Sequence, residues 1–168
     1  MLRKVNLRST IITGAAAAIL FCIPVYAYIR SARYQQSWLL YMGSILFMIA
    51  MWIHIIGDSK KRPGDDNTVA LIFASHMATI AGILFCCILC FLLLSFLVPG
   101  YLRPGITGTQ LDRSPVNTIH DKTNGMSFNI FMAATIINFS VGSFSGIVLP
   151  FYLKKNQAGD AKKPVPLH

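Results

Sequence analysis

Apolar positions along this chain gather into four long blocks that are separated by short polar segments. The longest block, 69–98, contains no Asp, Glu, Lys or Arg. An α-helix rises about 1.5 Å per residue and the core of a bilayer is about 30 Å thick, so roughly 20 apolar residues cross it. The pattern therefore predicts four membrane-spanning helices, over residues 10–28, 37–56, 69–98 and 126–153.

The polar segments between the blocks indicate how the helices are connected. The connections 30–36 and 58–67 are short, which forces neighbouring helices to run antiparallel. The segment 99–125 is rich in proline and glycine, so we expect it to be an irregular extramembrane loop. We expect an all-α integral membrane protein with one domain over 1–153, an antiparallel up-down bundle, and a basic, disordered tail over 154–168.

The first block allows two interpretations. It follows a basic start and has small residues near its end, as a cleaved signal peptide does. It is also long enough to span, and aromatic residues typical of a membrane–water interface surround the connection that follows it. For these two reasons we favour a helix that is retained in the mature protein.

Lysine and arginine are distributed unevenly between alternate segments. Ten of the 15 lie in the N-terminal segment, the second connection and the tail, and five lie in the first connection and the 99–125 loop. Because positive charge concentrates on the cytoplasmic side, we expect both termini in the cytoplasm and the protein in the inner or plasma membrane.

The formal net charge of +9 indicates a lipid surface more than a nucleic acid. The basic residues lie in short segments between apolar blocks, and the chain contains no soluble region large enough for a nucleic-acid-binding module. We therefore expect no nucleic-acid partner. Anionic lipid headgroups are the expected partner of the basic residues at the cytoplasmic side: Lys60, Lys61, Arg62, Lys154 and Lys155.

Small residues recur at helical spacing in the first and fourth blocks. Helices in lipid associate through close contacts at small residues and through side-chain hydrogen bonds. Either the two stripes pack within one chain, which we favour, or one of them binds a second copy or another membrane protein. A G-x-x-x-G motif alone is a weak signal. The predicted helix-packing residues are Gly14, Ala18, Ala134, Asn138, Gly142 and Gly146.

Several polar side chains inside the blocks are candidates for chemistry. Asn138 needs hydrogen-bond partners in hydrocarbon, and we favour an interhelical bond over a ligand contact. Ser75 and Thr79 begin a similar stripe in the third block, and with Asn138 they would line the path of a channel or carrier. Cys86 and Cys90 lie one turn apart, but free cysteine packs as a small apolar residue, so we expect no metal site.

His54 and His76 are the intramembrane groups that titrate near neutral pH. Three roles remain open for them: interfacial histidines bonded to backbone or headgroups, a proton or ion contact, or paired axial ligands of a b-type haem. The first is favoured. The haem alternative is the one in which these two residues would bind a cofactor, and otherwise we expect none.

No catalytic motif is visible in the sequence, and none of its motifs identifies a family. All six acidic residues fall in the expected loops or tail, which argues against a carrier that keeps an acid within a span. Arg103, Arg113 and His120 of the long loop are read as solvated. We therefore expect a non-enzymatic subunit or accessory factor that acts through helix–helix association. An oligomeric channel or carrier is the first alternative and a haem-binding redox subunit is the second.

Overall fold

The computed structural model describes residues 7–31, 33–60, 68–99, 101–102 and 125–160. Within these ranges the regular structure is entirely helical, without strands. Four helical segments are long and apolar enough to cross a membrane: Leu7–Ser31, Trp38–Lys60, Thr68–Leu97 and Met126–Leu153. The four spans expected from the sequence therefore correspond to four helices.

The helices follow the apolar blocks closely. They are α1 (Leu7–Ser31), α2 (Trp38–Lys60) and α3 (Thr68–Leu97), with the short 3-10 turn η2 (Tyr34–Gln36) before α2. The fourth span is continuous but has three parts: α4 (Met126–Met132), the π-helical turn η3 (Ala133–Ile137) and α5 (Asn138–Asp160).

Two helix ends differ from the expectation. α2 continues to Lys60, so Asp58 lies in a helix and not in a loop. α5 continues to Asp160, so the segment from Lys154 to Asp160 is helical where a disordered tail was expected. In α5 the apolar helix is followed by residues that tolerate helical geometry well, among them Lys, Gln and Ala, whereas in α2 the extension is four residues long, 57–60. The rest of the predicted tail, the Lys61 and Arg62 positions and the loop residues 103–124 lie outside the described residues.

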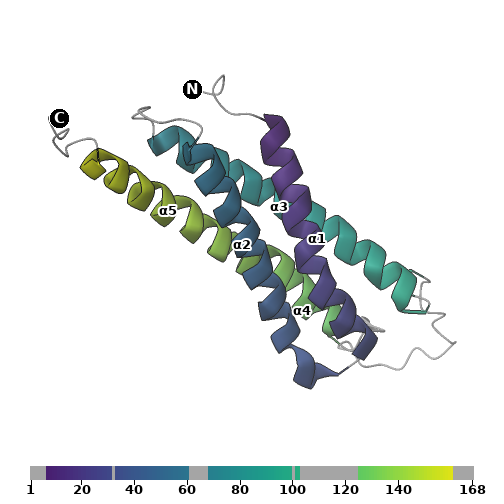
Figure 1. Ribbon diagram of the computed structural model, residues 1–168. Helices are drawn as coiled ribbons and strands as arrows, with labels where there is room; N and C mark the ends of the chain where they lie inside the picture. Colours follow the sequence, from purple (N-terminus) through teal and green to yellow (C-terminus); the bar gives the residue numbers. More distant parts are fainter. Residues whose placement is uncertain (1–6, 32, 61–67, 100, 103–124, 161–168) are drawn as a thin grey trace, which may run out of the picture.

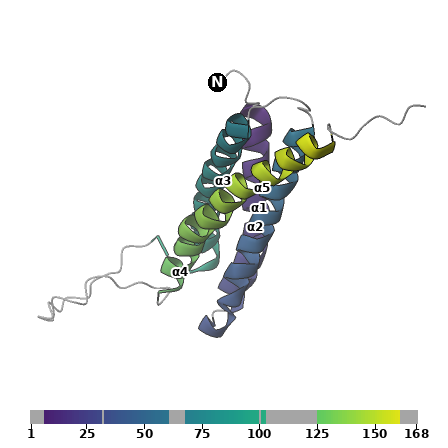
Figure 2. The ribbon, with the colours of Figure 1, turned by 90° about the vertical axis from the view of Figure 1, so that its left-hand side faces the viewer.

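The four long helices form a bundle in which α1 packs mainly against α2 and α3, and α5 packs against the same two helices. Figure 1 shows α3 and α5 running obliquely to α1 and α2, and Figure 2 shows the same group from the side. Obliquely crossed helices are expected where rows of side chains four residues apart interlock. The small-residue stripes of the fourth and third spans have this spacing.

Glycines allow the helices to approach closely where they cross. A Cβ added at Gly14 of α1 would lie 2.8 Å from the main-chain nitrogen of Gly82 in α3. A Cβ at Gly43 of α2 would lie 3.0 Å from the carbonyl oxygen of Phe21 in α1. Both separations are below normal van der Waals contact, so a side chain at Gly14 would require the backbone of α3 to shift, and one at Gly43 would require a smaller shift of Phe21.

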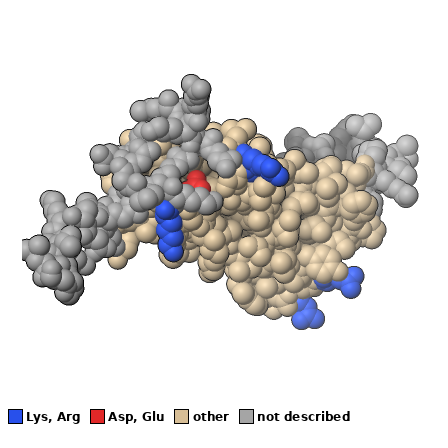
Figure 3. Space-filling model, turned by 45° about the horizontal axis from the view of Figure 1, so that its top comes forward, with Lys and Arg blue, Asp and Glu red and all other residues tan. Residues whose placement is uncertain are grey.

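The outside of the bundle is covered by large apolar side chains. Ile53, Phe96 and Phe144 are each more than half exposed, at 68%, 83% and 66%. Figure 3 shows a broad surface without charge, with Lys and Arg side chains near its margins. A surface of this size and composition is what the hydrocarbon of a bilayer would cover.

Candidate functional site

A buried acid–base pair lies in the last two turns of α2. His54 and Asp58 are 9% and 8% exposed. The Nε2 atom of His54 lies 4.0 Å from Oδ2 of Asp58, one helical turn further along. On the other side of the imidazole ring, Nδ1 of His54 lies 3.1 Å from Oγ1 of Thr13 in α1. The histidine thus connects an acid on its own helix to a hydroxyl on the neighbouring helix.

The position of Asp58 corrects the expectation that every acid lies outside the spans. The sequence contained a signal for it, because residues four apart on a helix lie on the same face and His54-Ile-Ile-Gly-Asp58 has this spacing. An ionisable residue inside a membrane helix is a functional candidate when a partner can be named. Asp58 and His54 meet that condition, and Thr13 was not singled out by the sequence.

A second polar contact joins α2 to α5. Nε1 of Trp52 donates a hydrogen bond of 2.8 Å to Oγ of Ser145, and that hydroxyl donates to the carbonyl of Val141. Ser75 of α3 donates to the carbonyls of Ile72 and Gly146. These bonds satisfy hydroxyl and indole groups inside the bundle, so in this region the polar side chains hold helices together.

Asn138 lies at the centre of the bundle, where it is fully buried. Its Nδ2 donates to the carbonyl of Ala134 at 3.4 Å and to Sγ of Cys86 in α3 at 3.7 Å. The Oδ1 atom has no hydrogen-bond partner among the described residues. Thr79 also packs here, against Gly142, with its hydroxyl donating to the carbonyl of Ser75. The three residues proposed to line a solute path are therefore buried between α3 and the fourth span.

The predicted small-residue stripes lie inside the bundle but do not face each other. Gly14 of α1 packs against Gly82, and Gly142 and Gly146 of α5 pack against Thr79 and Ser75, so both stripes use α3. Ala18 and Ala134 are also fully buried. Periodicity identified the buried face of each helix, whereas the choice of α3 as the shared neighbour depends on the tertiary arrangement.

The two histidines contact different helices. His76 of α3 is hydrogen-bonded through Nδ1 to the carbonyl of Ile72, and its Cε1 lies near Gly146 of α5. His54 contacts Thr13 of α1.

Cys86 and Cys90 are buried beside α1 and α5, as small apolar residues would be. Lys60 is exposed at the end of α2, and the side chains of Lys154 and Lys155 lie outside the described residues.

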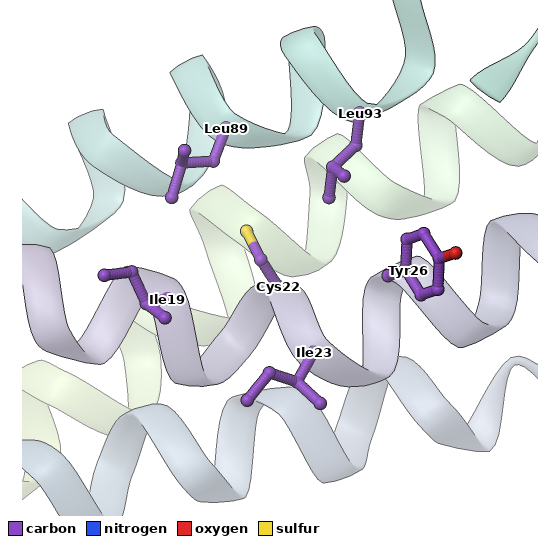
Figure 4. Close-up of a pocket in the computed structure, with 6 residues that line it drawn as sticks. All are labelled: Ile19, Cys22, Ile23, Tyr26, Leu89 and Leu93. Carbon is purple, nitrogen blue, oxygen red and sulfur yellow. The ribbon is translucent and has the colours of Figure 1, made fainter. Parts of the chain in front are cut away.

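A lateral groove between α1 and α3 was not expected from the sequence. It has a volume of about 350 Å³, is almost wholly apolar, and is open at the side of the bundle. Figure 4 shows the residues from α1 on one side and those from α3 on the other. The lining residues are Ile19, Cys22, Ile23, Tyr26, Leu89 and Leu93.

These features define the class of protein: an all-helical chain with four helices long and apolar enough to cross a membrane, as in a multi-pass membrane protein. Comparisons with protein-family models, curated proteins and solved structures give no match that would narrow this class.

Proposed function

We propose that this chain is a non-enzymatic membrane subunit or accessory factor that binds another transmembrane helix. The observation that carries the proposal is Gly57 of α2. A Cβ added at Gly57 would meet no described atom within 4 Å, unlike one added at Gly14 or Gly142. Glycine inside a helix costs roughly 1 kcal/mol relative to alanine. The packing of the described residues does not require a glycine at position 57. Its presence inside a helix is explained if a partner helix makes close contact there.

The residues that precede Gly57 extend this surface. Ile45, Ile49 and Ile53 are exposed at 52%, 42% and 68%, and with Gly57 they recur every four residues. Residues at this spacing share one face of a helix, which we name the α2 outer face. A small residue beside bulky apolar ones lets a partner backbone approach closely, and such contacts drive helix association in lipid.

Gly57→Leu is expected to weaken partner binding without unfolding the protein. Crosslinking in native membranes, followed by purification in mild detergent, should recover about tenfold less partner or second copy, which corresponds to roughly 1.4 kcal/mol. The thermal unfolding midpoint should stay the same or rise, because leucine favours helix more than glycine does. Ala16→Leu is the matched control, since Ala16 is also exposed but lies on α1. Equal recovery from Gly57→Leu and unmodified protein would refute the proposal.

The proposed topology is an antiparallel up-down bundle with both termini in the cytoplasm of an inner or plasma membrane. The excess of Lys and Arg in the N-terminal segment, second connection and tail supports it. Buried Ala17, Phe21 and Val25 support retention of the first span, because α1 contributes them to the core. Tags at either end should react with a membrane-impermeant label only after the cells are broken. A tag that is labelled in intact cells would overturn the assignment.

A proton-linked carrier is the second candidate, and the buried pair of His54 and Asp58 favours it. A carrier of this kind keeps an acid within a span. Liposomes loaded with a pH-sensitive dye should then acidify faster with the protein than without it, and Asp58→Asn should abolish the difference. Rates equal to those of empty vesicles would exclude proton transport and leave the association proposal standing.

The proposal does not include haem, because one ring nitrogen of each histidine already has a hydrogen-bond partner: Thr13 for His54 and the carbonyl of Ile72 for His76. The absorption spectrum of the protein purified from cells tests this directly. A Soret band that disappears on His76→Ala would reinstate the haem alternative.

A further inference from the structure

We propose that the groove between α1 and α3 binds one acyl chain of an anionic phospholipid, whose phosphate is held by Arg30. The groove walls are apolar, with Ile19 and Ile23 contributed by α1 and Leu89 and Leu93 contributed by α3 (Figure 4). A volume of about 350 Å³ lies within the range of small-molecule sites. An acyl chain can therefore lie within the groove and not only against the outer surface of the bundle.

The groove and the helical turn that leads from it to Arg30 together match the depth of one leaflet. Ile19 is the middle residue of α1, whose bounds are Leu7 and Ser31. Arg30 follows it by eleven residues, a rise of roughly 16 Å. Half of a bilayer core is about 15 Å. A groove that begins near the midplane therefore leads to Arg30 at the depth of the headgroups.

Polar groups occur at one end of the groove. Figure 4 shows the hydroxyl of Tyr26 directed along α1 away from Ile19. Arg30 is exposed and lies one turn beyond Tyr26, on the same face. Long side chains on a helix extend back toward the preceding turn, so the guanidinium can reach a headgroup at the Tyr26 end of the groove.

Positive charge at this end matches a headgroup that carries a net negative charge. Arg30 and Arg33 are both exposed at the end of α1. Asp58, the acid whose side chain the structure describes, is buried beside His54 near the opposite end of the bundle. A guanidinium binds phosphate oxygens through charge-assisted hydrogen bonds, and among the described side chains no carboxylate lies at this end. The apolar walls of the groove fit an acyl chain, and the arginines at its end fit an anionic headgroup. We therefore infer an anionic phospholipid as the occupant.

Photolabelling in nanodiscs tests the site. The full chain is reconstituted with phosphatidylglycerol that carries a diazirine in its acyl chain, or with the phosphatidylcholine analogue. Adducts should concentrate on peptides containing residues 19–26 and 89–93. Ile23→Trp, which fills the groove, should reduce them severalfold, and Leu89→Trp should do the same from the opposite wall. Ile147→Trp is the control, because Ile147 is an exposed isoleucine of α5 that lies outside both the groove and the α2 outer face.

A separate comparison tests whether Arg30 binds the headgroup. Arg30→Ala should remove the preference for phosphatidylglycerol over phosphatidylcholine, while Arg8→Ala at the other end of α1 should retain it. Two results would overturn the lipid site. One is a set of adducts spread evenly over all exposed faces. The other is labelling that both tryptophan variants leave unchanged, in protein whose thermal unfolding is normal. Crosslinking of the groove to another protein in native membranes, with loss of lipid adducts, would also overturn it.

Discussion

Gly14→Leu is expected to leave little folded protein in mild detergent. The first added carbon would lie 2.8 Å from the main-chain nitrogen of Gly82, and backbone inside a helix cannot move aside without breaking other contacts. Overpacking in a tight core costs about 1–3 kcal/mol and occasionally more, and leucine adds three further carbons. We expect a loss of at least about 3 kcal/mol in the free energy of unfolding. Thermal unfolding followed by circular dichroism measures it.

Two controls separate the clash from other effects of the substitution. Gly57→Leu introduces the same side chain where no described atom lies within 4 Å, so it should fold normally. Gly142→Ala should destabilise the bundle because its Cβ would meet the side chain of Thr79, and Thr79→Ala in the same chain should restore much of the loss. A normal unfolding midpoint for Gly14→Leu would mean that α1 and α3 do not cross at this residue.

His54→Leu is expected to have the second largest effect on stability. It leaves the buried carboxyl group of Asp58 without the imidazole that lies 4.0 Å away. The variant leaves the buried carboxyl group unpaired, and breaking a buried pair costs about 3–5 kcal/mol when both groups are charged. Asp58 lies near the end of α2, where water is closer, so we expect about 2–3 kcal/mol. The loss in the free energy of unfolding can be measured in mild detergent by titration with a denaturing surfactant.

The double variant His54→Leu/Asp58→Leu gives the matching test. Replacing a buried pair by apolar residues of similar size is often neutral, so the double variant should be more stable than His54→Leu alone. Thr13→Val, which removes only the hydroxyl at 3.1 Å from the imidazole, should cost about 1 kcal/mol. Additive losses for the two leucine substitutions would show that His54 and Asp58 do not interact.

The sequence was sufficient to predict the four helices because the bilayer thickness sets a minimum length for an apolar helix. The third block, predicted over 69–98, corresponds to α3 at Thr68–Leu97. Helix ends were harder to predict. Polar residues can continue a helix past the apolar block, as Asp58 in α2 and Lys154 in α5 do.

The candidate site was predictable only in part. Periodicity placed Gly142 and Asn138 on one face, and both are buried. It could not indicate that α3 is the neighbour of both stripes, because a helix face does not specify its partner. The same limit applies to Thr13, whose contact with His54 joins residues far apart in the sequence. The groove is formed by residues of α1 and α3 together, and no local pattern encodes which two helices lie side by side.

The π turn at Ala133–Ile137 has a consequence for how this span can change in length. Such a turn holds one more residue than an α turn. The carbonyls of Phe131 and Ala134 around it accept bonds from the side chains of Thr135 and Asn138. Losing a single residue from this turn would tighten it into ordinary helix while Ile130 and Gly142 kept facing inward. The fourth span thus contains a place where the chain can be shortened by one residue without rotating either half.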